Sequence, residues 1–167
     1  MVTLQGEVDI EDFKKVVFQN EEITVANEVL ETVRESLRFL KEFSENKIIY
    51  GVNTGFGPMA QYKIQDHQRV ELQYNLIRSH AAGSGTKIPP LYVKAAMLAR
   101  LNTLCLGKSG VHPSVIELMT ALINRNIMPV IYEHGGVGAS GDLVQLAHIA
   151  LVLIGEGEVH YHNNIRP

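Results

Sequence analysis

Three consecutive residues, Ala139, Ser140 and Gly141, could turn the polypeptide backbone into an electrophile. If the loop that holds them is compressed, the Gly141 amide nitrogen can attack the Ala139 carbonyl carbon and close a five-membered ring. One water leaves on ring closure and a second leaves from the Ser140 side chain, which produces a methylidene-imidazolone. Glycine leaves the attacking nitrogen unhindered, alanine leaves the carbonyl accessible, and serine supplies the leaving hydroxyl group. The product is an electrophile that no ordinary side chain can match.

The segment around this tripeptide suits such a reaction. Residues 135–142, Gly-Gly-Val-Gly-Ala-Ser-Gly-Asp, allow a tight turn that other groups can approach closely. An apolar run from Leu143 to Ile154 follows, and Asp142 is a suitable N-cap for a helix over that run. The positive end of the helix would then lie beside the loop, where it favours negative charge. Asp142 could also assist ring closure.

Two other uses of a glycine-rich loop fit the sequence less well. Gly136, Gly138 and Gly141 match the G-x-G-x-x-G dinucleotide fingerprint, but three residues separate them from the strand-like segment before them. Residues 161–163, Tyr-His-Asn, stand about 20 positions later, where the fingerprint needs an acidic residue. A serine nucleophile elbow, G-x-S-x-G, fails because Asp142 occupies the position of its last glycine. A plain glycine-rich turn in a non-catalytic helical or nucleotide-binding domain remains an alternative.

A second candidate group is Tyr50, which precedes the loop Gly-Val-Asn-Thr-Gly-Phe-Gly at residues 51–57. A phenol has an ordinary pKa of about 10, so it needs activation by its neighbours before it can act as a base near neutral pH. Amides of residues 55–57 could stabilise the phenolate. On the residues alone, a tyrosine after two isoleucines is typical of a core aromatic.

Three segments together resemble the aromatic amino acid ammonia-lyases, the family that includes the histidine, tyrosine and phenylalanine enzymes. Val137–Leu143 with Leu146–His148 resembles the segment that forms the prosthetic group. Tyr50–Gly57 resembles the catalytic tyrosine loop, and Leu76–Gly83 resembles the substrate-selectivity segment. The segments occur in the family's order and at similar spacings, so the resemblance covers most of the chain.

The resemblance implies a deamination without oxidation, either of histidine to urocanate or of tyrosine to coumarate. The related aminomutase reaction, in which the amine returns to the β-carbon, stays open as an alternative. Ala139, Ser140 and Gly141 are assigned to an autocatalytically formed 4-methylidene-imidazol-5-one, with no external cofactor. Tyr50 is assigned the removal of the β-proton.

The resemblance also implies a site for a small amino acid substrate at His80, Gly57 and Leu143. The pair Ser79-His80 is similar to the histidine enzymes, and a histidine that faces the ring also suits a tyrosine hydroxyl. Phenylalanine-specific members carry apolar residues there, and a phenylalanine ring would leave the histidine unpaired, so this substrate is the least favoured. Val144-Gln145, in place of the commoner Ala-Pro, resembles bacterial members that can prefer tyrosine. Histidine and tyrosine therefore both remain open.

Length and composition bound the remaining possibilities. The chain has 167 residues, a formal net charge of −3 and 46% hydrophobic residues, so no basic surface predicts nucleic-acid binding. The longest apolar run, 143–154, is too short to span a bilayer, and the start lacks the pattern of a signal peptide. The single cysteine, Cys105, lies in an apolar run typical of core packing and fits a reducing compartment. We therefore expect a cytoplasmic protein.

The spacing of apolar residues predicts a mainly α fold with a few very short strands and a reactive loop before a buried helix. Besides the helix over 143–154, helices are expected at 8–20, 25–44 with Thr24 as N-cap, 65–82, 91–106 and 114–126. Short extended segments are expected at 2–5, 48–50 and 128–130. His134 and His148 are expected to be structural. His160 and His162 have the spacing of a strand-borne metal pair, but without a third ligand no metal site is expected.

Members of the resembled family are much longer than this chain, so residues 1–167 are expected to be its N-terminal part, which carries the reactive loop. The run over 143–154 is apolar on every side, which fits a core that further sequence or other subunits complete. The family's active sites are assembled from several chains, and a homotetramer is implied. We therefore expect Ser140 to be unmodified, and the chain inactive, when these 167 residues stand alone.

Overall fold

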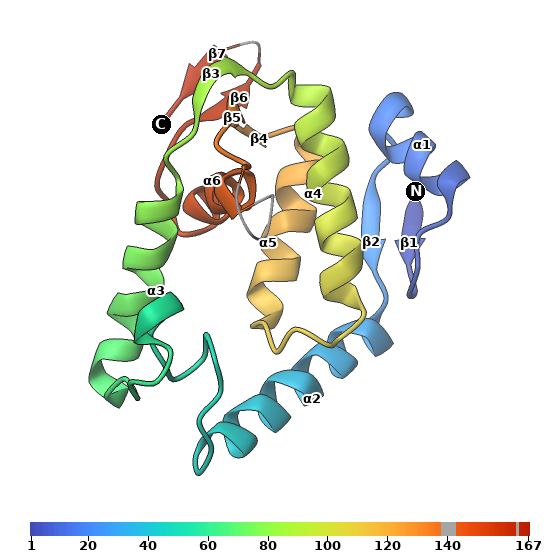
Figure 1. Ribbon diagram of the computed structural model, residues 1–167. Helices are drawn as coiled ribbons and strands as arrows, with labels where there is room; N and C mark the ends of the chain where they lie inside the picture. Colours follow the sequence, from blue (N-terminus) through green and yellow to red (C-terminus); the bar gives the residue numbers. More distant parts are fainter. Residues whose placement is uncertain (138–142, 163) are drawn as a thin grey trace.

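The computed structural model of the chain describes residues 1–137, 143–162 and 164–167, and its fold is mainly α, as the sequence predicts (Figure 1). The helices are α1 (Ile10–Gln19), α2 (Asn27–Ser44), α3 (Asp66–His80), α4 (Pro90–Cys105), α5 (Pro113–Asn124) and α6 (Leu143–Leu153), and a 3-10 turn, η1, spans Gly57–Met59. The strands are β1 (Val2–Leu4), β2 (Ile23–Val25), β3 (Ser84–Lys87), β4 (Met128–Pro129), β5 (Tyr132–His134), β6 (Val159–Tyr161) and β7 (Asn164–Arg166).

The short strands pair into three small sheets that join segments far apart in the sequence. β1 and β2 are parallel, β3 and β5 are antiparallel, and β4, β6 and β7 form an antiparallel sheet in that order. The β3–β5 pair matters most for the site. It ties the chain that leaves α3 to the chain that enters the loop before α6.

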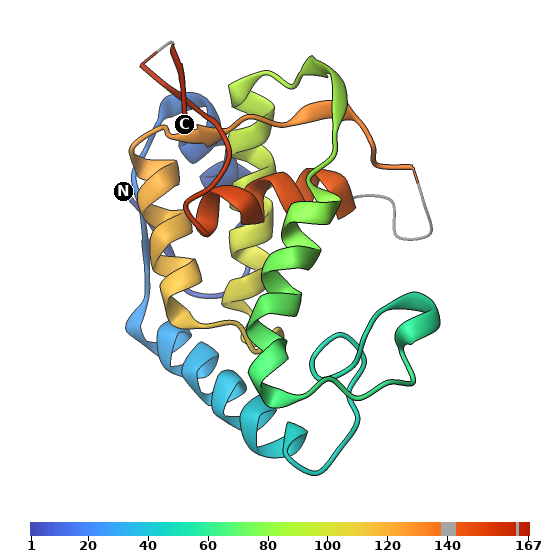
Figure 2. The ribbon, with the colours of Figure 1, turned by 90° about the vertical axis from the view of Figure 1, so that its left-hand side faces the viewer.

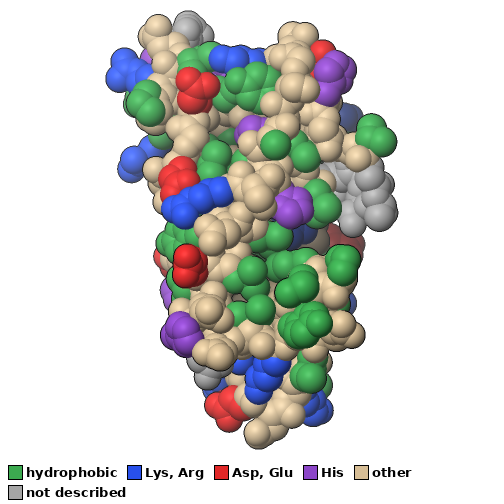
Figure 3. Space-filling view, turned by 60° about the vertical axis from the view of Figure 1, so that its left-hand side comes forward, with side chains coloured by type: hydrophobic (Ala, Val, Ile, Leu, Met, Phe, Trp, Pro, Cys, Tyr) green, Lys and Arg blue, Asp and Glu red, His purple; other side chains and the backbone are tan. Residues whose placement is uncertain are grey.

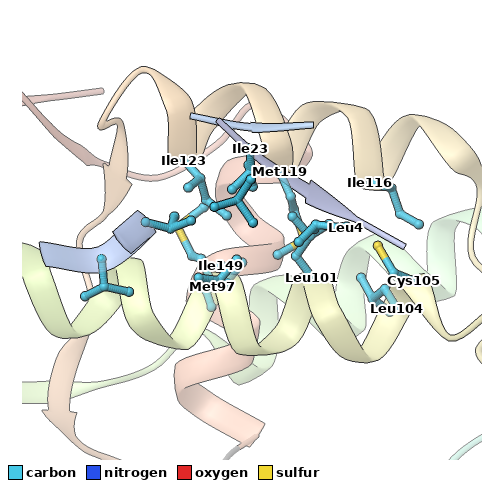
Figure 4. Packing of buried hydrophobic residues seen from close by; sticks show 14 of the residues in the cluster. Leu4, Ile23, Met97, Leu101, Leu104, Cys105, Ile116, Met119, Ile123 and Ile149 are labelled. Atoms are coloured by element: carbon cyan, nitrogen blue, oxygen red, sulfur yellow. The ribbon is translucent and has the colours of Figure 1, made fainter. Parts of the chain in front are cut away.

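α4 and α5 lie side by side at the centre of the fold (Figures 1 and 2). α1, α2, α5 and β4 all contact α4, which explains why the sequence of α4 is apolar around most of its circumference. Side chains from these elements, β1, β2 and α6 meet in one core (Figure 4), which includes Leu4, Ile23, Met97, Leu101, Leu104, Cys105, Ile116, Met119, Ile123 and Ile149.

Lys94 is buried beside this core and connects three helices. Its Nζ donates hydrogen bonds to Oδ1 of Asn20 at 2.8 Å and to Oδ1 of Asn126 at 2.7 Å. Asn20 directly follows α1 and Asn126 lies two residues after the end of α5, so both are near helix C-termini, where the helix dipole favours a cation. Burial lowers the pKa of Lys94.

Two local predictions are wrong. Thr24 is not the N-cap of α2, because it pairs with Thr3 in the parallel β1–β2 sheet and the helix begins at Asn27. The segment 48–50 is not extended. The amides of Val52 and Asn53 both donate to the Ile49 carbonyl and fold it into a turn. In addition, β3 and the β6–β7 hairpin form in segments that are not among the extended segments expected from the sequence.

α6 keeps part of its apolar surface exposed. Ala147, His148 and Ile149 are buried, whereas Leu143 is 51% exposed. The described elements that contact α6, chiefly α3, α5 and β4, cover only part of a helix that is apolar on every side. Neither α6 nor another helix of the described residues combines the length and apolarity needed to cross a membrane.

Cys105 packs in the core, as predicted, and burial raises the pKa of its thiol to about 11. In the unfolded chain the thiol ionises near its ordinary pKa of about 8.5, so between these values only the unfolded state loses the proton. The free energy of unfolding should therefore fall by roughly 3 kcal/mol as the pH rises through this window. Urea unfolding of the chain and of Cys105→Ala at a series of alkaline pH values checks the sign. The variant should show a shallower decline, and equal slopes would contradict the assignment.

Candidate active site

One cavity of about 630 Å³ brings together the described residues that the sequence predicts for proton transfer and substrate binding. Tyr50, Gly57, His80 and Leu143 all line its wall, although they lie in separate segments of the chain. The rest of the wall is mostly apolar and comes from Phe56 and from α3, α4, α5 and α6. Figure 3 views the molecule from the side of α3, and hydrophobic side chains gather in the lower half of that face. A cavity of this volume can hold a small molecule with an apolar ring.

Tyr50 stands at the edge of the cavity with its side chain 63% exposed. The Gly57 amide donates a hydrogen bond to the Tyr50 hydroxyl at 3.4 Å, and the Phe56 ring packs edge-on against the Tyr50 ring with 5.8 Å between centroids. The sequence predicted that amides of residues 55–57 stabilise the phenolate. The Gly57 amide does reach the phenol, whereas the Gly55 amide donates to the Tyr62 carbonyl. Gly57 has φ +53°, a left-handed conformation that glycine adopts without strain.

Asn53, which the sequence analysis did not single out, holds the start of this loop. It is fully buried, and its Oδ1 accepts a hydrogen bond from the Ile49 amide at 2.7 Å. Its Nδ2 donates to the carbonyls of Ser44 at 3.0 Å and Lys47 at 2.7 Å. The side chain thus joins the end of α2 to the turn that carries Tyr50. Asparagine within a glycine-rich loop is a recognisable signal for such bonds to the backbone.

Thr54 fixes the other side of the same turn. Its side chain is buried, and its Oγ1 accepts from the Gly51 amide at 3.2 Å and donates to the Gly55 carbonyl at 2.8 Å. Gln73 of α3 reaches the Gly51 carbonyl at 3.5 Å. The tyrosine loop is therefore held mainly by its own buried polar side chains.

Replacing Asn53 with Ala should loosen the tyrosine loop selectively. Three hydrogen bonds are lost, and one of them is the bond from the Ile49 amide. The local opening free energy should therefore fall by about 2 kcal/mol, which raises the exchange rate about 30-fold. The Ile64 amide donates to the backbone carbonyl of Asn53, so hydrogen exchange of the Ile49 and Ile64 amides, measured by NMR, reports this opening. Asn75→Ala, at an exposed position on α3, is the control and should leave both amides unchanged. Equal exchange in the two variants would contradict the role of Asn53.

His80 lies at the end of α3 with one ring nitrogen held by the helix itself. Nδ1 lies 2.9 Å from the Leu76 carbonyl oxygen and 3.1 Å from Ser79 Oγ. A carbonyl oxygen can only accept, so the contact with Leu76 requires the proton to be on Nδ1. In the neutral ring Nε2 is then an acceptor, and within the described part of the chain it has no hydrogen-bond partner.

Ala139, Ser140, Gly141 and the proposed N-cap Asp142 lie outside the described residues. The two ends of the loop are described. Gly135 has φ +124°, and a Cβ atom built on it would lie 2.8 Å from Cγ1 of Val144. Gly135 and Val144 therefore approach each other closely, one before and one after the segment that contains residues 138–142.

The other histidines that the sequence singled out do not line this cavity. His148 is buried and accepts a hydrogen bond from the Gly83 amide, and His134 is exposed, with Nε2 3.3 Å from the Glu133 carboxylate. His160 lies in β6 and His162 directly follows it. Within residues 1–137, 143–162 and 164–167, no group of three histidine, cysteine or acidic side chains is placed to hold a metal ion.

Comparison with known proteins gives one consistent result. Residues 8–167 match the family described as aromatic amino acid lyase. A histidine ammonia-lyase from Bacillus cytotoxicus is 43% identical over 163 residues, which are 96% of this chain and 32% of that protein. The chain thus spans about a third of the length of the curated relatives it matches.

Solved structures agree in fold. Tyrosine aminomutase from Streptomyces globisporus superposes with a TM-score of 0.89 at 35% identity, over 99% of this chain and 31% of that one. The ergothioneine-degrading enzyme ergothionase from Treponema denticola superposes with a TM-score of 0.91 at 27% identity, over 99% and 33% of the two chains.

Proposed function

Because the chain belongs to the aromatic amino acid lyase family, we propose that it supplies the reactive part of an enzyme that deaminates an aromatic amino acid without oxidation. The proposed reaction converts histidine to urocanate or tyrosine to coumarate, with release of ammonia. The observation that supports it best is the cavity shared by Tyr50, Gly57, His80 and Leu143. Its α6 wall begins directly after the loop that contains Ala139–Gly141.

The reaction requires removal of a β-hydrogen that is hardly acidic and departure of an amine that leaves poorly. A methylidene-imidazolone formed from Ala139, Ser140 and Gly141 would supply the electrophile that takes up the amine and makes it a better leaving group. The residues present fit this group, because the tripeptide has the three residue types that the condensation needs. Gly135 and Val144, which flank the segment that holds the tripeptide, approach each other closely.

Tyr50 would receive the β-hydrogen on its phenolate oxygen. That oxygen lies at the cavity wall, and the Gly57 amide points at it. A hydrogen bond to the charged form lowers the cost of ionising a phenol, so the amide assists the base. The buried anchors Asn53 and Thr54 keep the amide and the phenol together. Tyr50, rather than a histidine, is therefore assigned the proton transfer.

His80 would select the substrate through its unpaired Nε2. An acceptor in the cavity wall pairs with the N–H of an imidazole or with the O–H of a phenol. A phenylalanine ring offers no donor and leaves this acceptor unpaired, which penalises binding. The apolar side chains of Leu76 and Leu143 complete the wall for the ring. We therefore propose histidine or tyrosine as substrate.

An aminomutase reaction is the second candidate, because tyrosine aminomutase from Streptomyces globisporus is 35% identical over nearly the whole chain. The same electrophile and base would serve, and the difference would lie in the return of the amine to the β-carbon. A β-amino acid among the products would identify this reaction.

The direct test is turnover of histidine, tyrosine and phenylalanine by the complete enzyme that contains this chain. We expect ammonia together with urocanate or coumarate, and little product from phenylalanine. Absence of turnover for all three substrates, in a protein whose loop peptide has the mass of the unmodified sequence, would contradict the proposal and favour a non-catalytic domain.

We also propose that residues 1–167 are the N-terminal part of a longer chain, which works as a homotetramer in the cytoplasm. The match to about a third of the length of the relatives supports the first point, and the family resemblance supports the others. Light scattering of the complete enzyme would test the tetramer.

A further inference from the structure

A partly buried hydrogen bond joins the segment that follows α3 to α6. The Gly83 amide donates to Nε2 of His148 at 3.2 Å, and His148 is only 9% exposed. An amide can only donate, so Nε2 must be unprotonated and the neutral ring must carry its proton on Nδ1. Burial lowers the pKa of His148, which favours the same neutral form.

The approach of the two segments depends on the absence of a side chain at residue 83. A Cβ atom on Gly83 would lie 2.9 Å from His148 Nε2, 3.1 Å from Tyr132 Cβ and 3.3 Å from the His134 carbonyl oxygen. The Tyr132 ring packs against the His148 ring with 5.7 Å between centroids. Helix α6, the chain after α3 and strand β5 therefore meet at this one point.

The joined segments carry the groups assigned to substrate recognition and to amine capture. Gly83 follows His80 by three residues, and His148 lies on the helix that begins directly after the reactive loop. A second link, between Arg78 and Glu156, uses both carboxylate oxygens of Glu156 but is exposed to solvent. Exposed ion pairs are screened and contribute little, so the partly buried bond to His148 is the firmer of the two links.

We propose that His148 is a positioning residue, which through Gly83 fixes the place of His80 relative to α6, the helix that follows the reactive loop. This inference rests on the proposed function of His80. Displacement of a substrate-orienting group by about 1 Å can cost about 100-fold in rate. A shift of α3 against α6 should therefore change which aromatic ring is accepted, and not only the stability of the fold.

The test compares His148→Gln, whose amide oxygen replaces Nε2 as acceptor, with His148→Leu, which has no acceptor. In the complete enzyme, His148→Leu should lower kcat/KM for the preferred substrate by about 10- to 100-fold. The ratio of kcat/KM between histidine and tyrosine should also move closer to one. His148→Gln should keep both the kcat/KM for the preferred substrate and the ratio between substrates close to those of the parent enzyme. Arg78→Gln is the matched control, and it should leave the preference unchanged. A His148→Leu enzyme with reduced stability but an unchanged preference would show a merely structural role and overturn the proposal.

Hydrogen exchange gives a readout that does not depend on activity. In the complete enzyme, the peptide that contains Gly83 should exchange faster in His148→Leu than in the parent, and His148→Gln should restore protection. If His148→Leu does not fold, His148→Asn replaces it, because its shorter side chain should not reach the Gly83 amide. Unchanged exchange in the variants that lack the acceptor would refute the link itself. If the parent enzyme turns over none of the substrates but the variants alter exchange at Gly83, the result would count against the proposed function. The hydrogen bond between Gly83 and His148 would still be supported.

Discussion

Replacement of Tyr50 with Phe in the complete enzyme should lower kcat by about 10²–10⁴-fold, the range that general acid–base catalysis usually contributes. The change removes one oxygen and leaves the ring that packs against Phe56. The hydroxyl is the atom that the Gly57 amide contacts. The loss should therefore appear in kcat, with little change in KM, because the substrate ring is bound elsewhere in the cavity.

Tyr62→Phe is the matched control for this experiment. Tyr62 belongs to the same loop and is 54% exposed, but it does not line the cavity. Its variant should keep full activity. If Tyr50→Phe and Tyr62→Phe behave alike, the base must be another group.

Ser140→Ala should reduce turnover by about 10³-fold or more, since enzymes accelerate reactions by at least about 10⁶-fold and this variant cannot form the electrophile. The parent enzyme's peptide spanning Ala139–Gly141 should lack the mass of two water molecules and show the near-ultraviolet absorbance of a conjugated ring. Both signals should be absent in the variant. Ser84→Ala, at an exposed position in β3, should retain activity and both signals.

The same mass measurement separates the complete enzyme from the 167 residues alone, in which we expect Ser140 to be unmodified. Full activity in Ser140→Ala would overturn the assignment of the electrophile. A mass deficit in the isolated 167 residues would show that the described fold is sufficient to close the ring.

The candidate site divides into residues that the sequence could identify and residues that it could not. Tyr50, Gly57, His80 and Leu143 belong to motifs with distinctive sequences, so a single chain was enough to predict them as candidates. Asn53 and His148 are ordinary residue types, and their importance depends on partners that folding brings close. The tautomer of His80 likewise follows from one distance to the Leu76 carbonyl, which no spacing in the sequence encodes.

The sequence by itself determined the helices and the chemistry available to Ala139–Gly141. A helix is held by bonds between residues four apart, and the proposed cyclisation involves three neighbours, so both are local properties of the chain. Only the tertiary structure decided that Thr24 belongs to a strand and that residues 84–87 pair with residues 132–134. It also placed four separate segments around one cavity. Strand pairing and cavity formation depend on contacts between residues distant in sequence, and local patterns carry little information about such contacts.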